Sequence, residues 1–156
     1  MAFYYRDPNA PTPNHPPSLG VVALLTQGGS MLLERRSDAN RWGLIGGAVD
    51  AEESLHAALL REVMEETGLD LRSYQFFGTF SDPSRIIHYP DGTIIRIITL
   101  AYTAVIDADS VLRLSAESLE LQFFTPAELM HLDIVETHRH IVDRFLALPS
   151  AAPILE

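Results

Sequence analysis

The stretch that decides the fold is Gly47-Ala-Val-Asp-Ala-Glu-Glu53-Ser-Leu-His-Ala-Ala-Leu-Leu-Arg61-Glu62-Val63-Met64-Glu65-Glu66-Thr67-Gly68-Leu69. Its pattern predicts a helix between Glu53 and Thr67, and Gly68 stands where a left-handed C-cap belongs. At about 100° per residue, three glutamates fall within roughly a third of the helix circumference. They are Glu62, Glu65 and Glu66. We expect the apolar residues on the other side to bury against a sheet, namely Leu59, Leu60, Val63 and Met64.

Carboxylates gathered on one helix face repel one another, at a cost of a few tenths of a kcal/mol per pair in an isolated helix. A divalent cation compensates for this repulsion. Magnesium prefers hard oxygen ligands and keeps waters, so a few glutamates can hold it while substrate phosphates complete its shell. The alternative is a solvated helix face on which Arg61 makes exposed ion pairs of little value.

The stretch from Gly47 to Leu69 resembles the Nudix box, Gly-x5-Glu-x7-Arg-Glu-U-x-Glu-Glu-x-Gly-U with U a bulky aliphatic residue, at every defined position. At ordinary residue frequencies the fixed identities would recur by chance on the order of once in ten million chains of this length. The resemblance implies the α/β class, as a Nudix-type α/β/α sandwich around a mixed β-sheet. It also implies metal-dependent hydrolysis of a pyrophosphate bond in a nucleoside diphosphate linked to another moiety.

The resemblance implies a role for each matched position. Glu62, Glu65 and Glu66 resemble the carboxylates that bind catalytic Mg²⁺ or Mn²⁺, and one of them would orient the attacking water. Arg61 and Glu53 resemble the supporting ion pair that holds this helix turn in place.

Two further positions of the resemblance lie outside the box. The carbonyl of Gly46 resembles another metal ligand, and a glycine there lets backbone and metal approach closely. Glu120 stands just before an aromatic pair, where many Nudix proteins carry another acid that serves as ligand or base. Glu117 lies nearby in the sequence, and the alternative for Glu120 is an exposed strand residue.

The rest of the chain divides into an extended, proline-rich N-terminal arm, the Nudix domain and a C-terminal tail, at residues 1–17, 18–150 and 151–156. Apolar runs and turn residues predict a hairpin of strands 20–26 and 31–35, then strands 74–80, 93–106 and 119–124. Thr125, Pro126 and Glu128 are typical of a helix start with a capping box, and a final amphipathic helix is expected over 136–148.

Composition narrows the function further. The 156 residues contain no cysteine, which excludes disulfides, thiolate metal sites and cysteine nucleophiles. A formal net charge of −10 disfavours binding to nucleic acid or to anionic membranes. The chain has no signal-peptide pattern and no apolar run long enough to span a bilayer, so a cytoplasmic protein is expected.

Substrate choice is harder to derive, because in Nudix enzymes it depends on residues outside the box. The candidates in and beyond the long loop 81–92 are Arg85, His88, Tyr89 and Arg96. Arginines there would clamp a phosphate and Tyr89 would stack on a base, whereas the alternative is an ordinary polar loop with a turn at Tyr89-Pro-Asp-Gly92. The histidines are expected at the surface, and Trp42 is expected to pack beside the glycine loop.

These observations leave several functions open. Nucleoside triphosphates, nucleotide sugars and ADP-ribose-like dinucleotides all fit the expected class of substrate, and so does a triphosphatase that removes modified nucleotides. The alternative from another class is a noncatalytic nucleotide sensor that regulates a partner protein. The arm of residues 1–17 is a candidate dimer element, which would make the protein a homodimer.

Overall fold

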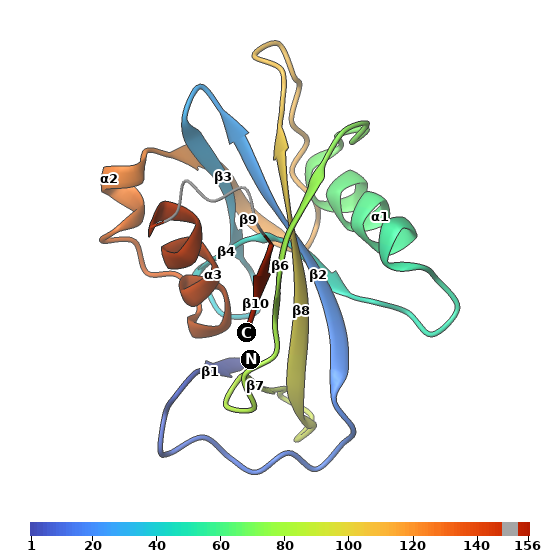
Figure 1. Cartoon of the computed structure of the whole chain (residues 1–156), viewed down its shortest axis with the longest axis vertical. Helices are drawn as coiled ribbons and strands as arrows, with labels where there is room; N and C mark the ends of the chain where they lie inside the picture. Colours follow the sequence, from blue (N-terminus) through green and yellow to red (C-terminus); the bar gives the residue numbers. More distant parts are fainter. Residues whose placement is uncertain (148–152) are drawn as a thin grey trace.

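The computed structural model describes residues 1–147 and 153–156, and its centre is a mixed sheet with helices on both faces (Figure 1). Helix α1 (Leu55–Thr67) covers one face, whereas α2 (Pro126–Leu129) and α3 (Glu136–Ala147) cover the other. This arrangement confirms the α/β/α sandwich expected from the sequence. The last residue of the predicted final helix, Leu148, lies outside the described residues.

The sheet is built around two long parallel strands. The strands are β1 (Ala2–Tyr4), β2 (Ser18–Gln27), β3 (Ser30–Arg36), β4 (Trp42–Gly43), β5 (Ile45–Ala48), β6 (Gln75–Phe80), β7 (Ile86–His88), β8 (Ile94–Val105), β9 (Ser118–Phe124) and β10 (Ile154–Leu155). β2 runs parallel to β8 and antiparallel to β3 and β5. The pairing of β2 with β5 brings the glycine-rich segment before α1 onto the sheet.

Strand β2 is apolar throughout because both of its faces are buried. Val21, Ala23 and Leu25 pack in the cluster that contains Leu59 and Val63 of α1. The alternate residues Val22 and Leu24 pack in the cluster under α3, with Ile141 and Val142. Side chains alternate across a strand, so one run of five apolar residues supplies both layers of the core.

Helix α1 begins and ends with the expected caps. The Ser54 side chain accepts a hydrogen bond from the Ala57 N–H at 3.1 Å, and Gly68 has the left-handed φ of 73°. Met64 is 41% exposed, so its expected burial was wrong. Glu62 and Glu66 are instead buried, at 9% and 8% exposed, because they follow Leu59 and Val63 around the side of the helix that faces the sheet.

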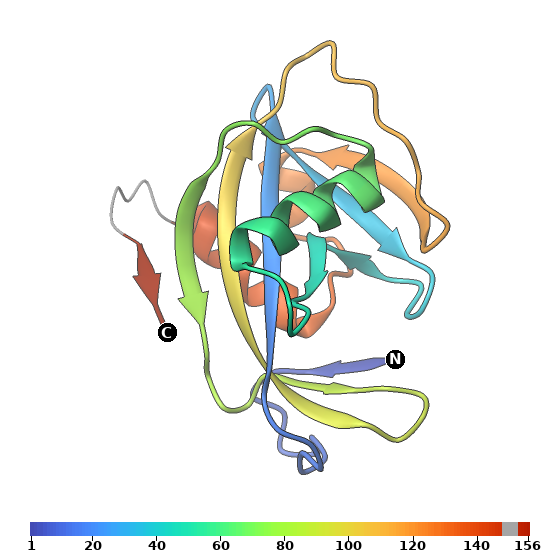
Figure 2. The same ribbon diagram turned by 90° about the vertical axis from the view of Figure 1, so that its right-hand side faces the viewer.

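The proline-rich arm and the long loop contain strands that the sequence patterns did not predict. β7 lies within the expected loop 81–92 and pairs with β8, and the arm's strand β1 pairs antiparallel with β7. Figure 2 shows this three-stranded group at the end of the molecule where the N-terminus lies. In the arm, Phe3 is buried against Ile87, Ile95 and Ile97. The arm therefore packs against its own chain through this side chain and the β1–β7 pairing.

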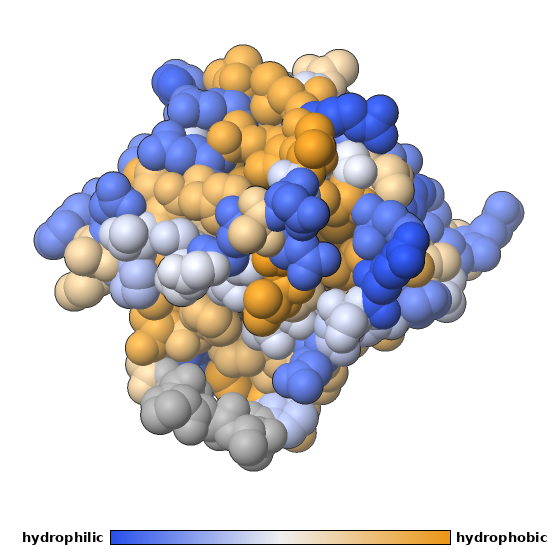
Figure 3. All heavy atoms as spheres, turned by 90° about the horizontal axis from the view of Figure 1, so that it is seen from above, coloured by the Kyte–Doolittle hydropathy of each residue, from blue (hydrophilic) through white to orange (hydrophobic). Residues whose placement is uncertain are grey.

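The opposite end of the molecule has a mixed surface. Seen from above in Figure 3, apolar residues gather across its middle and hydrophilic residues border them. Large apolar side chains that are exposed elsewhere along the described chain include Val105, Val111 and Leu114. No helix among residues 1–147 and 153–156 is long and apolar enough to cross a membrane.

We predict that Gly68→Ala destabilises the fold by about 1 kcal/mol, because an L-residue is strained at this positive φ and its Cβ would lie 2.8 Å from Arg113 Nε. Thermal unfolding followed by circular dichroism should show a Tm lower by about 2–4 °C. Gly68→Asn is the control, because asparagine tolerates the left-handed region and should lose less. Equal losses for the two variants would contradict this account of the cap.

Candidate active site

A cavity of about 310 Å³ opens between α1, the sheet and the N-terminal strand. Gly46, Gly47, Glu62 and Glu66 line it where β5 meets α1. Apolar and aromatic residues of the β1–β7–β8 group also line it, among them Phe3, Tyr89, Ile95 and Ile97. The cavity thus combines an acidic part with an apolar part, as expected for a ligand that carries both phosphates and a ring.

The two glycines allow backbone and carboxylates to approach closely. Gly46 has a φ of 142°, and a Cβ at this position would overlap the Val21 carbonyl of β2. A Cβ on Gly47 would stand 2.5 Å from Glu62 Oε1. The Gly46 N–H donates to Glu66 Oε2 at 2.8 Å. Only glycine at both positions lets β5 pair with β2 while the two carboxylates rest on its backbone.

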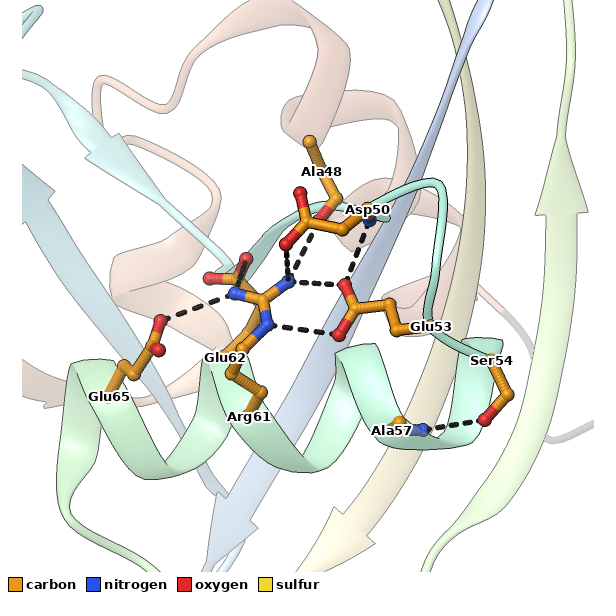
Figure 4. A network of polar contacts seen from close by, with 8 residues as sticks. All are labelled: Ala48, Asp50, Glu53, Ser54, Ala57, Arg61, Glu62 and Glu65. Carbon is orange, nitrogen blue, oxygen red and sulfur yellow. Dashed lines mark hydrogen bonds and ion pairs between the residues drawn. The ribbon is translucent and has the colours of Figure 1, made fainter.

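Arg61 gathers the acidic residues of the helix into one network (Figure 4). Its guanidinium forms a fork with Glu53, with Nη2 donating to Oε1 at 2.6 Å and Nε to Oε2 at 3.0 Å. Nη1 donates to Glu62 Oε1 at 2.7 Å and to Glu65 Oε2 at 3.2 Å, and Nη2 also reaches the Ala48 carbonyl. The network ties the helix to the loop before it, and the paired Arg61 holds the pKa of Glu53 at about 2.

The buried carboxylates of the cavity are compensated only in part. Burial, followed by the charge of Glu34, raises the pKa of Glu66 to about 9. Burial likewise raises the pKa of Glu62, against the opposing effect of Arg61. Glu34 is 2% exposed and its pKa is also raised, chiefly by burial. Three acids in and beside one cavity wall therefore disfavour their own ionisation unless a cation is present.

The donor set fits a hard divalent cation. Carboxylate oxygens of Glu62 and Glu66 border the cavity beside the Gly46 and Gly47 backbone. Among the described residues, however, no three acidic or histidine side chains are gathered as a metal site. The reason is visible in the network, since Arg61 contacts both Glu62 and Glu65 and Gly46 N–H engages Glu66. The guanidinium supplies the positive charge that a cation would supply.

The comparisons with known proteins agree with this geometry. The model of the NUDIX domain matches residues 14–145. The chain belongs to the Nudix family. It is 31% identical over 122 residues to the nucleoside triphosphatase NudI of Escherichia coli O139:H28, covering 73% of this chain and 86% of that protein. It is 28% identical over 131 residues to a MutT-like protein of Streptomyces ambofaciens, covering 83% and 77% of the two chains.

A solved Nudix structure shares the architecture. The MutT protein from Methanosarcina mazei Go1 aligns with a TM-score of 0.68 at 26% identity, covering 86% of this chain and 96% of that one. The model match begins at residue 14, so strand β1 and Phe3 lie outside the matched part of the Nudix domain. One wall of the cavity therefore includes an element that lies outside the matched NUDIX domain.

The predicted substrate contacts separate into two groups. Tyr89 lines the cavity. Arg85 is fully buried and donates to Thr99 Oγ1 and to the Thr137 carbonyl, at 3.1 and 2.8 Å. Arg96 donates to the Ser81 carbonyl, and neither arginine is among the lining residues, nor is His88. Both arginines are held by the protein's own acceptors instead of facing the cavity.

The extra acid predicted outside the Nudix box is placed differently from the expectation. Glu120 pairs across the β3–β9 ladder with Arg35, and their charged atoms lie 4.0 Å apart at an exposed position. The structure does not bring Glu120 to the cavity, which Glu117 lines instead. Glu117 precedes β9 and Glu120 lies within it, and the β3–β9 register shifts between Arg35 and Arg36, so sequence position alone did not decide between these two acids.

The expectation that the histidines lie at the surface was wrong for His138. This residue is 9% exposed and lines the cavity, and its Nδ1 accepts a hydrogen bond from the Leu44 N–H at 3.0 Å. Trp42 packs as expected, with its ring 4.7 Å from Phe124 in an edge-on arrangement. Phe3, Arg36 and Thr99 also line the cavity. No short motif marks these residues, since they come from distant strands and a helix.

We predict that Glu66→Gln raises the stability of the metal-free protein at pH 8 by at least about 1 kcal/mol, or about 2–4 °C in Tm. Glutamine keeps an acceptor for the Gly46 N–H and is neutral without taking up a proton, whereas Glu66 stays neutral in the fold at pH 8 only by binding one. Because the folded pKa of about 9 lies above the ordinary value of 4.5, wild-type stability should fall as the pH rises between these values. The variant should remove this part of the slope.

Thermal melts in EDTA at pH 5 and pH 8 make this measurement. Glu65→Gln is the matched control, because the Glu65 side chain is 59% exposed and its replacement should leave both Tm values nearly unchanged. A lower Tm for Glu66→Gln at pH 8 would show that Glu66 is not an electrostatic burden on the apo fold.

Proposed function

We propose that this Nudix protein hydrolyses a pyrophosphate bond in a nucleoside diphosphate derivative with the help of Mg²⁺ or Mn²⁺. The observation that carries the proposal is the pair of buried carboxylates, Glu62 and Glu66, packed against the backbone of Gly46 and Gly47 inside a cavity. Buried acids whose charge Arg61 compensates only in part favour a cation, and phosphates are the ligands that such a cation shares with a protein. A nucleoside triphosphate is the first substrate to test, since the relative in Escherichia coli is named a nucleoside triphosphatase.

The contacts of the glutamates and of Arg61 suggest a separate role for each. Glu62, Glu65 and Glu66 would hold the cation together with the Gly46 carbonyl, and the cation supplies charge neutralisation and a more acidic water. One of the glutamates would accept a proton from the attacking water. Arg61 is fixed by Glu53 and keeps the helix turn in position. When the cation binds, Arg61 would release Glu62 and Glu65 as ligands for it.

We predict that cleavage of the pyrophosphate bond, monitored by chromatographic separation of the nucleotide products, depends on the added divalent cation and on the buried glutamates. Glu62→Gln and Glu66→Gln should each lower kcat by at least about a hundredfold on the best substrate, because each removes a carboxylate that would hold the cation against the phosphates. The panel contains nucleoside di- and triphosphates, ADP-ribose, dinucleotides and nucleotide sugars, with Mg²⁺, Mn²⁺ or EDTA. Glu120→Gln is the control and should retain nearly full activity.

The outcomes of this panel separate the two classes of function. Turnover of one substrate class that disappears in EDTA and in both buried variants supports the enzyme. No turnover on any compound, together with retained nucleotide binding, would overturn the proposal in favour of a noncatalytic sensor.

We predict that Glu53→Gln weakens the affinity for Mg²⁺ or Mn²⁺ by about 10–100-fold, although Glu53 is not itself a ligand. Without its charged fork, Arg61 would engage Glu62 and Glu65 more strongly and compete with the cation. Isothermal titration with the metal alone gives the dissociation constant. Asp50→Asn is the matched control, because Asp50 stands 3.9 Å from Arg61 and its side chain is 76% exposed. Equal effects of both variants would contradict a specific role for the fork.

A further inference from the structure

His138 presents one nitrogen of its ring to the cavity as a hydrogen-bond donor. Its Nδ1 is occupied as an acceptor by the Leu44 N–H, which requires the proton of the neutral ring to sit on Nε2. No described residue accepts a hydrogen bond from Nε2, and His138 lines the cavity. Gly43 permits this position, since a Cβ there would stand 3.1 Å from Nδ1. The hydrogen bond from the Leu44 N–H thus fixes the neutral His138 ring in one tautomer.

Thr99 supplies a second donor on the same wall. Its Oγ1 accepts a hydrogen bond from Arg85 Nη2 at 3.1 Å, which leaves the hydroxyl proton free. The same Arg85 nitrogen also donates to the carbonyl of Thr137, the residue next to His138. Arg85 therefore joins β8 to α3 directly behind the two donors. Thr99 is 3% exposed and lines the cavity.

The charged groups on this side of the cavity are already paired. Arg36 donates to both oxygens of Asp38, at 3.0 and 2.7 Å, and reaches Glu34 at 3.4 Å. Both carboxylate oxygens of Asp38 therefore already accept a hydrogen bond from Arg36. Glu117 belongs with the acidic part, since its charge raises the pKa of both Glu34 and Glu62. The flat apolar walls beside the donors come from Phe3, Ile95 and Ile97.

We propose that His138 and Thr99 form a base-recognition site that selects nucleotides with keto bases over nucleotides with amino bases. The inference rests on the proposed function, because it takes the phosphates to lie at the acidic part of the cavity. Guanine presents two adjacent acceptors, N7 and O6, and uracil and thymine present O4. Adenine and cytosine present an amino donor at the corresponding position, which would face the His138 Nε2–H and leave both donors unpaired, whereas the Thr99 hydroxyl can donate to one kind of base or accept from the other.

The test compares GTP and UTP with ATP and CTP, which share one ribose and one triphosphate. Wild-type kcat/KM should favour the keto pair by at least about tenfold, since a site built to hydrogen-bond one group rejects the analogue that lacks it. His138→Phe should reduce this ratio by about tenfold, whereas Thr99→Val should lower kcat/KM for both kinds of base and change the ratio less. Thr99→Ser retains the hydroxyl and should keep both the rates and the preference. His140→Phe alters a histidine outside the cavity lining and should leave the ratio unchanged.

The ratio distinguishes recognition from damage to the fold, because a general loss of structure lowers all four values together. An unchanged ratio in His138→Phe, or a wild-type preference for ATP and CTP, would overturn the inference. Calorimetric titration of the four diphosphates in EDTA separates it from the proposed function. Tighter binding of GDP and UDP in EDTA, together with no turnover of any triphosphate in Mg²⁺ or Mn²⁺, would refute hydrolysis and uphold the base site, whereas turnover without a base preference would do the reverse.

Discussion

The close approach of the Gly46–Gly47 backbone to both β2 and α1 is the constraint on which the rest of the site depends. A Cβ at either position would collide, with the Val21 carbonyl in one case and with the Glu62 carboxylate in the other. Because neither side chain is present, β5 pairs with β2 and the helix settles onto the sheet with two glutamates inside. The two glycines thus allow the acidic face of the helix to be buried as one wall of the cavity.

Burial raises the pKa of these two glutamates. An exposed glutamate on a helix is ordinary, whereas Glu62 and Glu66 lose solvation that the fold itself does not replace. Arg61 relieves part of this cost, and its guanidinium also carries the fork to Glu53. A bound cation would displace these contacts, so in the proposed function stability and function would oppose each other at this wall.

The apolar part of the cavity has a separate origin. Strand β1 lies outside the part of the chain that matches the NUDIX domain model, yet its Phe3 packs on β7 and β8 and lines the cavity. Arg85 is buried between β8 and α3, where it contacts Thr99 and the Thr137 carbonyl. The acidic part therefore comes from one contiguous motif, and the opposite part is assembled from the arm, two strands and the last helix.

The sequence by itself determined the helix with its C-cap, the apolar strand β2, the family and the identities of the acids on one helix face, since these depend on local spacing. Only the tertiary structure decided that Met64 is exposed, that Arg85 is buried and that His138 lines the cavity. Periodicity gives the faces of a helix but not how far it is rotated against the sheet. A lone histidine or arginine carries no local signal of its partners, because those partners are separated from it by tens of residues and meet only when the layers pack.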